Sequence, residues 1–381
     1  LPAMRSRPFA AALLAAAALT MTSSFAAAQD SIEDKLHFSG YGEVHYNSHE
    51  LSEIIENDPP AEVDVHRFVL GWRYDFTPKI RMDAEVDFEH AATEIELEYA
   101  YLEYDLAAAT SLRAGAVLMP IGPLNEFHEP PNYYSVERPY VESSIMPTTW
   151  QEIGLGLVGR LGGGALGYRA YVVAGLDAAR FDTFNGIREG RRHGAEAPAE
   201  DLAGVARLEY SARNGLNLGG SAYYGGADQG DSTLGDVTVT ILNADARFRR
   251  AGFDLKGVVY HTSVGDADAL SSALSSPTDS VVVGESMLGW YGEAAYDVLR
   301  RDREGSSGRA LFLFGRYEDF DTNQDVPPGF VANPAANRTV ITGGVSYMPV
   351  DKIAFKADVE HWTDDTDADL TRFNLGAAFQ F

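Results

Sequence analysis

The chain has 381 residues and carries 56 acidic side chains against 30 lysines and arginines, a formal net charge of −26. Nucleic-acid binding is excluded as a main activity, because so acidic a chain repels phosphate backbones. The sequence contains no cysteine. Disulfides, thiolate metal sites and cysteine nucleophiles are therefore excluded as well.

Residues 1–28 are predicted to be an export signal that is removed. A short basic start, Met4–Arg7, precedes an almost wholly apolar stretch over 8–21, and Ala26–Ala28 offers the small residues of a cleavage site. The mature chain is expected to span residues 29–381. No later run reaches the roughly 18 apolar residues that a membrane-spanning helix needs.

The rest of the chain alternates apolar and polar side chains in segments of about ten residues separated by turn residues. In the segment 94–101, for example, Tyr99 and Tyr101 are predicted on the apolar face, opposite Glu98. The predicted strands cover 36–46, 68–74, 79–89, 94–101, 112–118, 153–161, 166–175, 202–211, 216–224, 237–249, 253–261, 288–296, 310–317, 339–347, 353–361 and 371–381.

The last predicted strand is apolar on one face and ends in an aromatic residue. Phe379 and Phe381 lie on that apolar face, and such an ending is typical of outer-membrane β-barrels, in which these residues act as the membrane assembly signal. Lipid requires the apolar face, and closure onto the first strand satisfies the sheet edge. The sequence predicts an all-β, antiparallel, up-and-down transmembrane barrel of about 16 strands. A half-buried strand of a soluble sandwich is the alternative.

The connections support one barrel domain over 29–381. Short turns, such as those at 76–78 and 213–215, alternate with mostly longer acidic stretches at 47–62, 119–151, 176–201, 262–285 and 319–337. Short periplasmic turns and longer external loops are the expected asymmetry. A barrel of this size encloses an aqueous lumen, and only residues 29–35 precede the first strand, so no plug is expected. The predicted function is passive diffusion of small hydrophilic solutes or ions across the outer membrane.

The longest connection, residues 119–151, is predicted to fold inward and narrow the lumen, because a loop this long in a compact fold is usually functional. Its prolines and aromatic residues suit a loop that packs against a wall. A surface loop that is merely long is the alternative.

Three stretches follow one another in the chain: Gly115–Gly122, with a G-x-x-x-x-P-x-G pattern, Val136–Pro139, with a Glu–Arg pair, and Glu152–Leu157. Together they resemble the phosphate-selective porin O and P family. The first-strand phrase Phe38–Glu43 also resembles that family. The resemblance implies a trimeric sixteen-stranded channel. For an outer-membrane barrel, the expected partners are the membrane lipids, lipopolysaccharide and the barrel assembly machinery. An anion- or phosphate-selective pore is the alternative function, although the predicted inner face shows no excess of basic residues.

Charged residues of the wall and the third loop are predicted to line the pore. Arg113, Arg160 and Arg169 are expected to face Glu126 or Glu129 across the constriction; mutual pairing of these charges is the alternative. The predicted lumen and constriction residues are Arg73, Arg81, Arg113, Glu126, His128, Glu129, Glu137, Arg138, Arg160, Arg169 and Arg207.

Two weaker signals complete the predictions. Asp365, Asp367 and Asp369 alternate as calcium ligands can, but the glycine and distal glutamate of an EF-hand are missing, which favours surface solvation. No cofactor is otherwise expected. The sequence shows no H-E-x-x-H, G-x-S-x-G or P-loop motif, so a barrel enzyme such as a protease or lipase is the less favoured class, as is a purely structural barrel.

Overall fold

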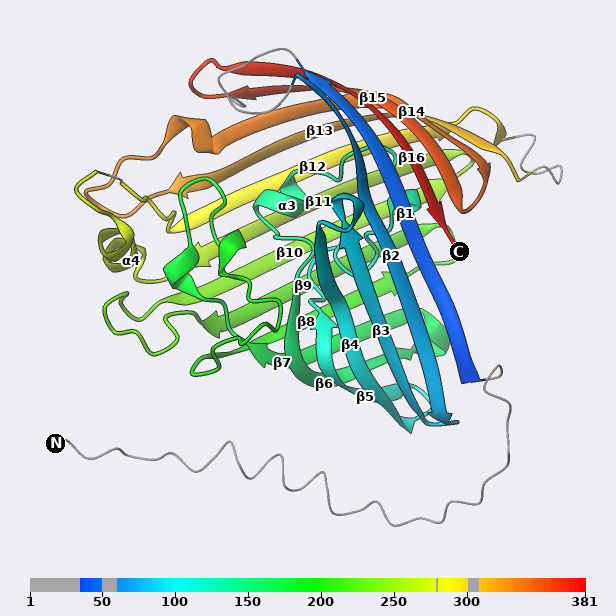
Figure 1. Cartoon of the computed structure of the whole chain (residues 1–381), viewed down its shortest axis with the longest axis horizontal. Coiled ribbons are helices and arrows are strands. Elements are labelled where there is room, and N and C mark those ends of the chain that lie inside the picture. Colours follow the sequence, from blue (N-terminus) through cyan, green and yellow to red (C-terminus); the bar gives the residue numbers. More distant parts are fainter. Residues whose placement is uncertain (1–34, 50–59, 279, 301–307) are drawn as a thin grey trace, which may run out of the picture. The chain divides into compact units, whose positions relative to one another are not determined.

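The sheet of this protein closes on itself. In the computed structural model, which describes residues 35–49, 60–278, 280–300 and 308–381, each strand pairs with its sequence neighbours. The first strand, β1 (Leu36–His49), then pairs antiparallel with the last, β16 (Asp369–Gln380), with Gly42 opposite Phe379 (Figure 1). The predicted export signal lies outside the described residues. The described part of the chain thus confirms the predicted all-β, up-and-down barrel of sixteen strands.

The other strands are β2 (Ala61–Thr77), β3 (Ile80–Glu89), β4 (Glu94–Ala107), β5 (Thr110–Leu118), β6 (Gln151–Leu161), β7 (Leu166–Ala174), β8 (Leu202–Ser211), β9 (Leu216–Gly226), β10 (Thr238–Arg250), β11 (Phe253–Val264), β12 (Ser286–Asp297), β13 (Ala310–Asp325), β14 (Asn337–Val350) and β15 (Ile353–Asp364). The helical segments are short: η2 (His90–Ala92), η3 (Pro130–Asn132), α3 (Val141–Ser144), η4 (Gly162–Gly164), η5 (Ala178–Arg180), η6 (Arg188–Gly190), α4 (Ala267–Leu274) and η7 (Pro334–Ala336). Within the described ranges, no helix is long and apolar enough to cross a membrane.

The two-residue period of the strands separates an apolar outside from a polar inside. Leu155 and Leu157 of β6 are exposed on the outer face. On the inner face, charged side chains such as Glu293 of β12 and Arg316 of β13 are almost completely buried and form ion pairs with each other. An apolar exterior is what a hydrocarbon environment stabilises.

Two predictions about the strands are wrong in detail. The pairing of β3 with β4 shifts register between Glu85 and Val86, and a bulge of this kind re-aims the side chains beyond it. As a result Tyr99 and Tyr101 face the lumen, where Arg113 stacks on the Tyr101 ring at 4.1 Å. The long loop predicted from residue 319 begins later, because β13 continues to Asp325.

The two rims of the barrel differ. One, here called the short-turn rim, carries tight connections such as 78–79, 108–109 and 351–352. The other, the loop rim, carries the connections 175–201 and 265–285, and it also carries two short ones at 90–93 and 365–368.

The seam between β1 and β16 is packed by the terminal aromatic residues. The rings of Phe379 and Phe381 stack with their centroids 6.5 Å apart. They lie over Gly42 and Gly40, where an added Cβ would come within 2.7 Å of ring carbon atoms. At Gly40 that Cβ would also lie 2.5 Å from the carbonyl oxygen of Val69. Any side chain at Gly40 therefore overpacks the seam.

We expect Gly40→Val to destabilise the folded barrel by about 1–3 kcal/mol, the usual cost of overpacking. The matched control is Gly257→Val on β11, where an added Cβ meets nothing within 4 Å. The temperature at which the folded band converts to the unfolded band in SDS gel electrophoresis measures the effect. Equal conversion temperatures for both variants would contradict the packing described for the seam.

Candidate functional site

The connection between β5 and β6, residues 119–150 and here called the lumen loop, lies within the barrel (Figure 1). Its side chains contact opposite parts of the wall. The Tyr41 hydroxyl of β1 lies 2.9 Å from His128 Nε2, and Arg169 of β7 lies 3.0 Å from Glu126. Tyr260 of β11 donates a hydrogen bond of 2.6 Å to Glu142. The loop therefore crosses the space that the strands enclose.

One asparagine joins the two ends of the lumen loop. The Asn125 side-chain amide donates to the carbonyl oxygens of Met119 and Trp150, both at 2.8 Å. Its own oxygen accepts from the Trp150 backbone N–H at 2.9 Å. Met119 and Trp150 are fully buried. A buried amide that uses both its donors and its acceptor fixes the chain around it.

Charged groups of the wall satisfy the backbone of the second half of the loop. The Val136 N–H donates to Asp358 of β15 at 2.6 Å, and the Val141 N–H donates to Glu318 of β13 at 3.0 Å. Lys356 of β15 donates to the carbonyl oxygens of Pro130 and Ser135. These side chains provide the partners that buried backbone groups require, so a polar wall and an inward loop depend on each other.

Two acids of the loop, the half-buried Glu137 and the fully buried Glu142, have different environments. Although burial opposes it, the hydrogen bond from His45 holds the pKa of Glu137 well below its usual range, and Asn47 donates a second bond. Burial raises the pKa of Glu142 to about 7, against the lowering effect of the hydrogen bonds from Tyr260 and Tyr291. Glu142 therefore changes its protonation near neutral pH.

Most of the predicted arginines of the wall lie in ion pairs. Arg81 and Arg113 both pair with Glu103, while Arg169 pairs with Glu126 and Glu209. Arg207 pairs with Glu209 and Asp245 and is almost completely buried. Of the three arginines expected opposite Glu126, the structure brings Arg169 into contact with it, whereas Arg113 points to Glu103.

The other predicted residues lie farther apart. Arg160 is exposed and lines a cavity at the short-turn rim. Arg73 pairs with Asp75 in its own strand and is 45% exposed. Glu129 accepts hydrogen bonds from Asn132 and Gln380 rather than from an arginine.

The last predicted group, Asp365, Asp367 and Asp369, lies in and beside the β15–β16 turn. Asp365 accepts a hydrogen bond of 2.8 Å from Asn337, and the three carboxylates are not among the described groups whose atoms come close enough to hold a metal ion.

Sequence reasoning missed two clusters. Arg67 of β2 lies amid four carboxylates, at distances from 2.5 Å to Glu89 to 3.9 Å to Glu98. Extending the predicted alternation of β2 by one residue toward the N-terminus places Arg67 on the polar face. The second cluster, Arg188 and Arg191, lies in the irregular loop 175–201, where no regular alternation of apolar and polar residues could predict it. Burial, together with the nearby positive charge of Arg188, lowers the pKa of Arg191 to about 9.

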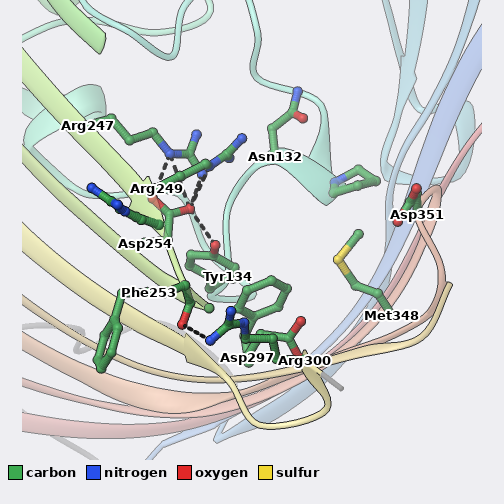
Figure 2. Close-up of a pocket in the computed structure, with 15 residues that line it drawn as sticks. Asn132, Tyr134, Arg247, Arg249, Phe253, Asp254, Asp297, Arg300, Met348 and Asp351 are labelled. Carbon is green, nitrogen blue, oxygen red and sulfur yellow. Dashed lines mark hydrogen bonds and ion pairs between the residues drawn. The ribbon is translucent and has the colours of Figure 1, made fainter. Parts of the chain in front are cut away.

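Cavities lie at both rims. At the short-turn rim, one of about 780 Å³ is lined by Arg81, Glu103, Arg113 and Arg160. A second, of about 580 Å³, is shown in Figure 2, where Arg247, Arg249 and Tyr134 converge on Asp254. At the loop rim, a cavity of about 330 Å³ is lined by acidic and basic residues, among them Arg67, Glu96, Arg138, Arg188 and Arg191.

Solved structures with the same fold include an outer-membrane channel and an anion-selective porin. The outer-membrane channel DcaP of Acinetobacter baumannii is 12% identical with a TM-score of 0.59, over 91% of this chain and 97% of that one. OprB of Pseudomonas putida is 10% identical with a TM-score of 0.58, over 92% of this chain and 95% of that one. An anion-selective porin of Comamonas acidovorans is 10% identical with a TM-score of 0.54, over 91% of this chain and 99% of that one. The chain therefore has the sixteen-stranded barrel fold of porins.

The family of this chain is shown by a relative found through sequence similarity. An uncharacterised protein of Aquifex aeolicus is 33% identical over 358 residues, which are 90% of this chain and 79% of that protein. The chain belongs to the same family as this protein. Comparison with models of known protein families gives no match, so the resemblance to phosphate-selective porins stays a prediction.

We expect the pKa of Glu142 to make the anchoring of the lumen loop depend on pH. The folded state binds this proton more tightly than the unfolded chain, because the pKa is raised to about 7. The stabilisation is therefore complete below the ordinary carboxyl pKa and is lost as the pH rises through about 7. Hydrogen exchange over residues 141–146, corrected for the intrinsic rate, should show at least about tenfold less protection at about pH 8 than at about pH 5.

Glu142→Gln, which cannot lose a proton, should remove this change, whereas Glu189→Gln on the exposed surface should leave it intact. A wild-type protein with equal protection at both pH values would contradict the expectation.

Proposed function

We propose that this protein is an outer-membrane channel for passive diffusion of small hydrophilic solutes and ions. The observation that carries the proposal is a closed sixteen-stranded barrel with polar cavities at both rims and a loop across its lumen. The exposed apolar side chains of the wall support a place in a lipid bilayer. Transport of this kind needs no catalytic group, and a homotrimer is the assembly that the resemblance to porins suggests.

We propose further that solutes pass between the lumen loop and strands β2–β6. The cavity of about 780 Å³ at the short-turn rim and that of about 330 Å³ at the loop rim are both lined from β3 and β4. Between them, the inner face of these strands carries Asp83, Glu85, Asp87 and Glu98. Arg67 and His128 meet this strip at its most buried part, at Asp87 and Glu98. The charges of such a strip set ion selectivity by their sign and position.

An anion-selective channel, with phosphate as one solute, is the second candidate. It is favoured by the arginines of the loop-rim cavity. Among the described residues, Arg138 Nη1 is buried without a hydrogen-bond partner. Arg191 donates to the carbonyl oxygens of Pro147, Thr148 and Thr149. Three guanidinium groups beside one opening attract anions, and the acidic strip beyond them opposes anion passage.

The proposed function predicts stepwise conductance when the purified protein is added to a planar lipid bilayer. Solute passage can be checked independently by the swelling of liposomes in small sugars. A folded barrel that produces neither conductance nor swelling would contradict the channel.

Charge-removing variants should reveal the path. Asp83→Asn removes a negative charge from the acidic strip and should shift the reversal potential in a salt gradient toward anions. Arg138→Gln should shift it toward cations. Arg213→Gln, in an exposed turn at the short-turn rim, is the control and should leave the potential unchanged. If neither variant differs from the control, solutes do not follow β3 and β4.

A further inference from the structure

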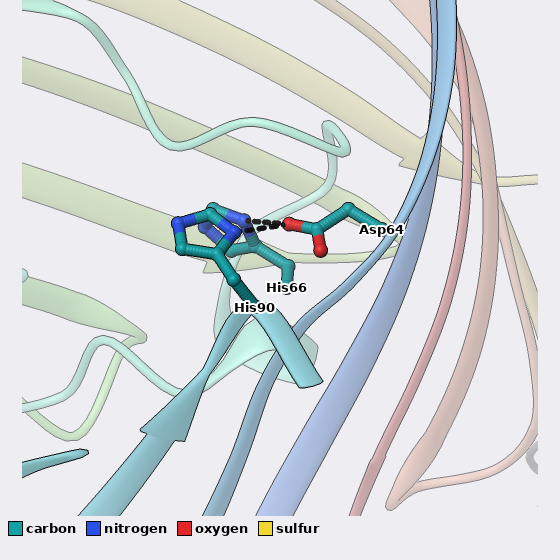
Figure 3. Close-up of side chains that lie close together, drawn as sticks. All are labelled: Asp64, His66 and His90. Carbon is teal, nitrogen blue, oxygen red and sulfur yellow. Dashed lines mark hydrogen bonds and ion pairs between the residues drawn. The ribbon is translucent and has the colours of Figure 1, made fainter. Parts of the chain in front are cut away.

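Two histidines and one aspartate converge at the loop rim, beside the cavity that His45 and Glu137 also line. His66 Nδ1 lies 3.3 Å from Asp64 Oδ2, and His90 Nδ1 lies 2.7 Å from the same oxygen. One ligand atom of each residue lies within 4.8 Å of the others. Figure 3 shows both imidazole rings turned toward the carboxylate.

The backbone explains why these three residues meet. Asp64 and His66 are two residues apart in β2, so their side chains share the inner face. The register of β1 with β2 shifts between Glu43 and His45, and this bulge allows His66 and the next residue, Arg67, both to face inward. Arg67 pairs with Glu89 in the β2–β3 ladder. His90 directly follows Glu89 and thus lies beside His66.

His90 is held by an unusual turn. His90, Ala91 and Ala92 all have positive φ angles, 49°, 57° and 68°, a conformation that residues with a Cβ seldom adopt. The turn places the His90 ring edge-on to His66, with ring centroids 5.5 Å apart. On its other side, His66 stacks on His45 at 4.6 Å. The rings of His45, His66 and His90 therefore stand in an ordered row.

We propose that Asp64, His66 and His90 bind a divalent transition-metal ion such as Zn²⁺. Two imidazole nitrogens with one carboxylate oxygen form a ligand set that suits zinc, nickel or copper and does not suit magnesium or calcium, which prefer oxygen alone. In a tetrahedral zinc site, ligand atoms lie about 3.3 Å apart. The present spacing, from 2.7 to at most 4.8 Å, needs only small side-chain movements to reach it.

The surroundings complete the site. The adjacent cavity of about 220 Å³ leaves room for water or a fourth ligand. His49 lines this cavity, and its Nε2 is buried without a hydrogen-bond partner among the described residues. The three ligand side chains are accessible, with exposed fractions of 23% for Asp64, 27% for His66 and 46% for His90. A metal ion can therefore reach them from the loop rim.

The test is zinc binding by the full barrel in detergent, after removal of metal with a chelator and by competition with a fluorescent zinc indicator. The wild type should bind one Zn²⁺ with micromolar or tighter affinity, and excess Mg²⁺ should not compete. His66→Ala and His90→Ala should each weaken binding by at least about tenfold.

His37→Ala is the matched control, since His37 lies 3.2 Å from Asp75, a histidine–aspartate pair without a second histidine in contact among the described residues. It should bind zinc as the wild type does. Equal affinity in His66→Ala, His90→Ala and His37→Ala, or no binding by the wild type, would overturn the proposal. His90→Gln, in a turn outside the strands, decides the question if His66→Ala fails to fold. The measurement does not involve conductance, so its outcome is independent of the proposed channel.

Discussion

The structure depends on one constraint: every strand must find hydrogen-bond partners on both edges. Within hydrocarbon, an unpaired backbone group costs several kcal/mol, and the ladder between β1 and β16 removes the last free edges. Closure also fixes which side chains point inward, because the side-chain period of a strand is two. The polar lumen is thus a consequence of the closed ladder. The packing of Phe379 and Phe381 on Gly42 and Gly40 shows how tightly the joining strands approach.

The polar lumen in turn makes an inward loop possible. A loop that leaves water must have its backbone groups satisfied, and here Asp358, Glu318 and Lys356 of the wall provide partners for the lumen loop. The first part of the loop is held against the wall by apolar contacts instead. Met119 and Ile121 pack in one apolar cluster with wall residues such as Val239 and Tyr260, which face inward near the loop rim. The interior therefore has an apolar sector toward β7–β11 and a charged sector along β2–β4, and the second is where we place the path of solutes.

Much of this fold could be read from the sequence, because a two-residue period and the contrast between short turns and long loops are local signals. Bulges are not local, since they depend on the neighbouring strand. The shift at Glu85 therefore turned Tyr99 and Tyr101 to the side opposite to the predicted one. The contacts of the lumen loop, such as Glu142 with Tyr260, join residues far apart in the chain, and no pattern in the sequence indicates them. The sequence predicted that Arg113, Arg160 and Arg169 face Glu126 or Glu129, but it could not single out Arg169 and Glu126 as the pair that forms. The row formed by His45, His66 and His90 likewise arises only from strand pairing and the bulge beside it.

The position of the lumen loop against the wall is the central claim, and an engineered disulfide tests it most directly. A Cβ added at Gly376 of β16 would lie 3.7 Å from the Cβ of Val136, within the range of about 3.5–4.5 Å found in disulfides. The natural chain has no cysteine, so Val136→Cys/Gly376→Cys introduces a single pair. Mild oxidation of the folded barrel should join this pair nearly completely. The control pair Val136→Cys/Gly257→Cys, with its second cysteine on the outer face of β11, should stay reduced. A folded barrel in which the first pair also stays reduced would contradict the inward loop and the account built on it.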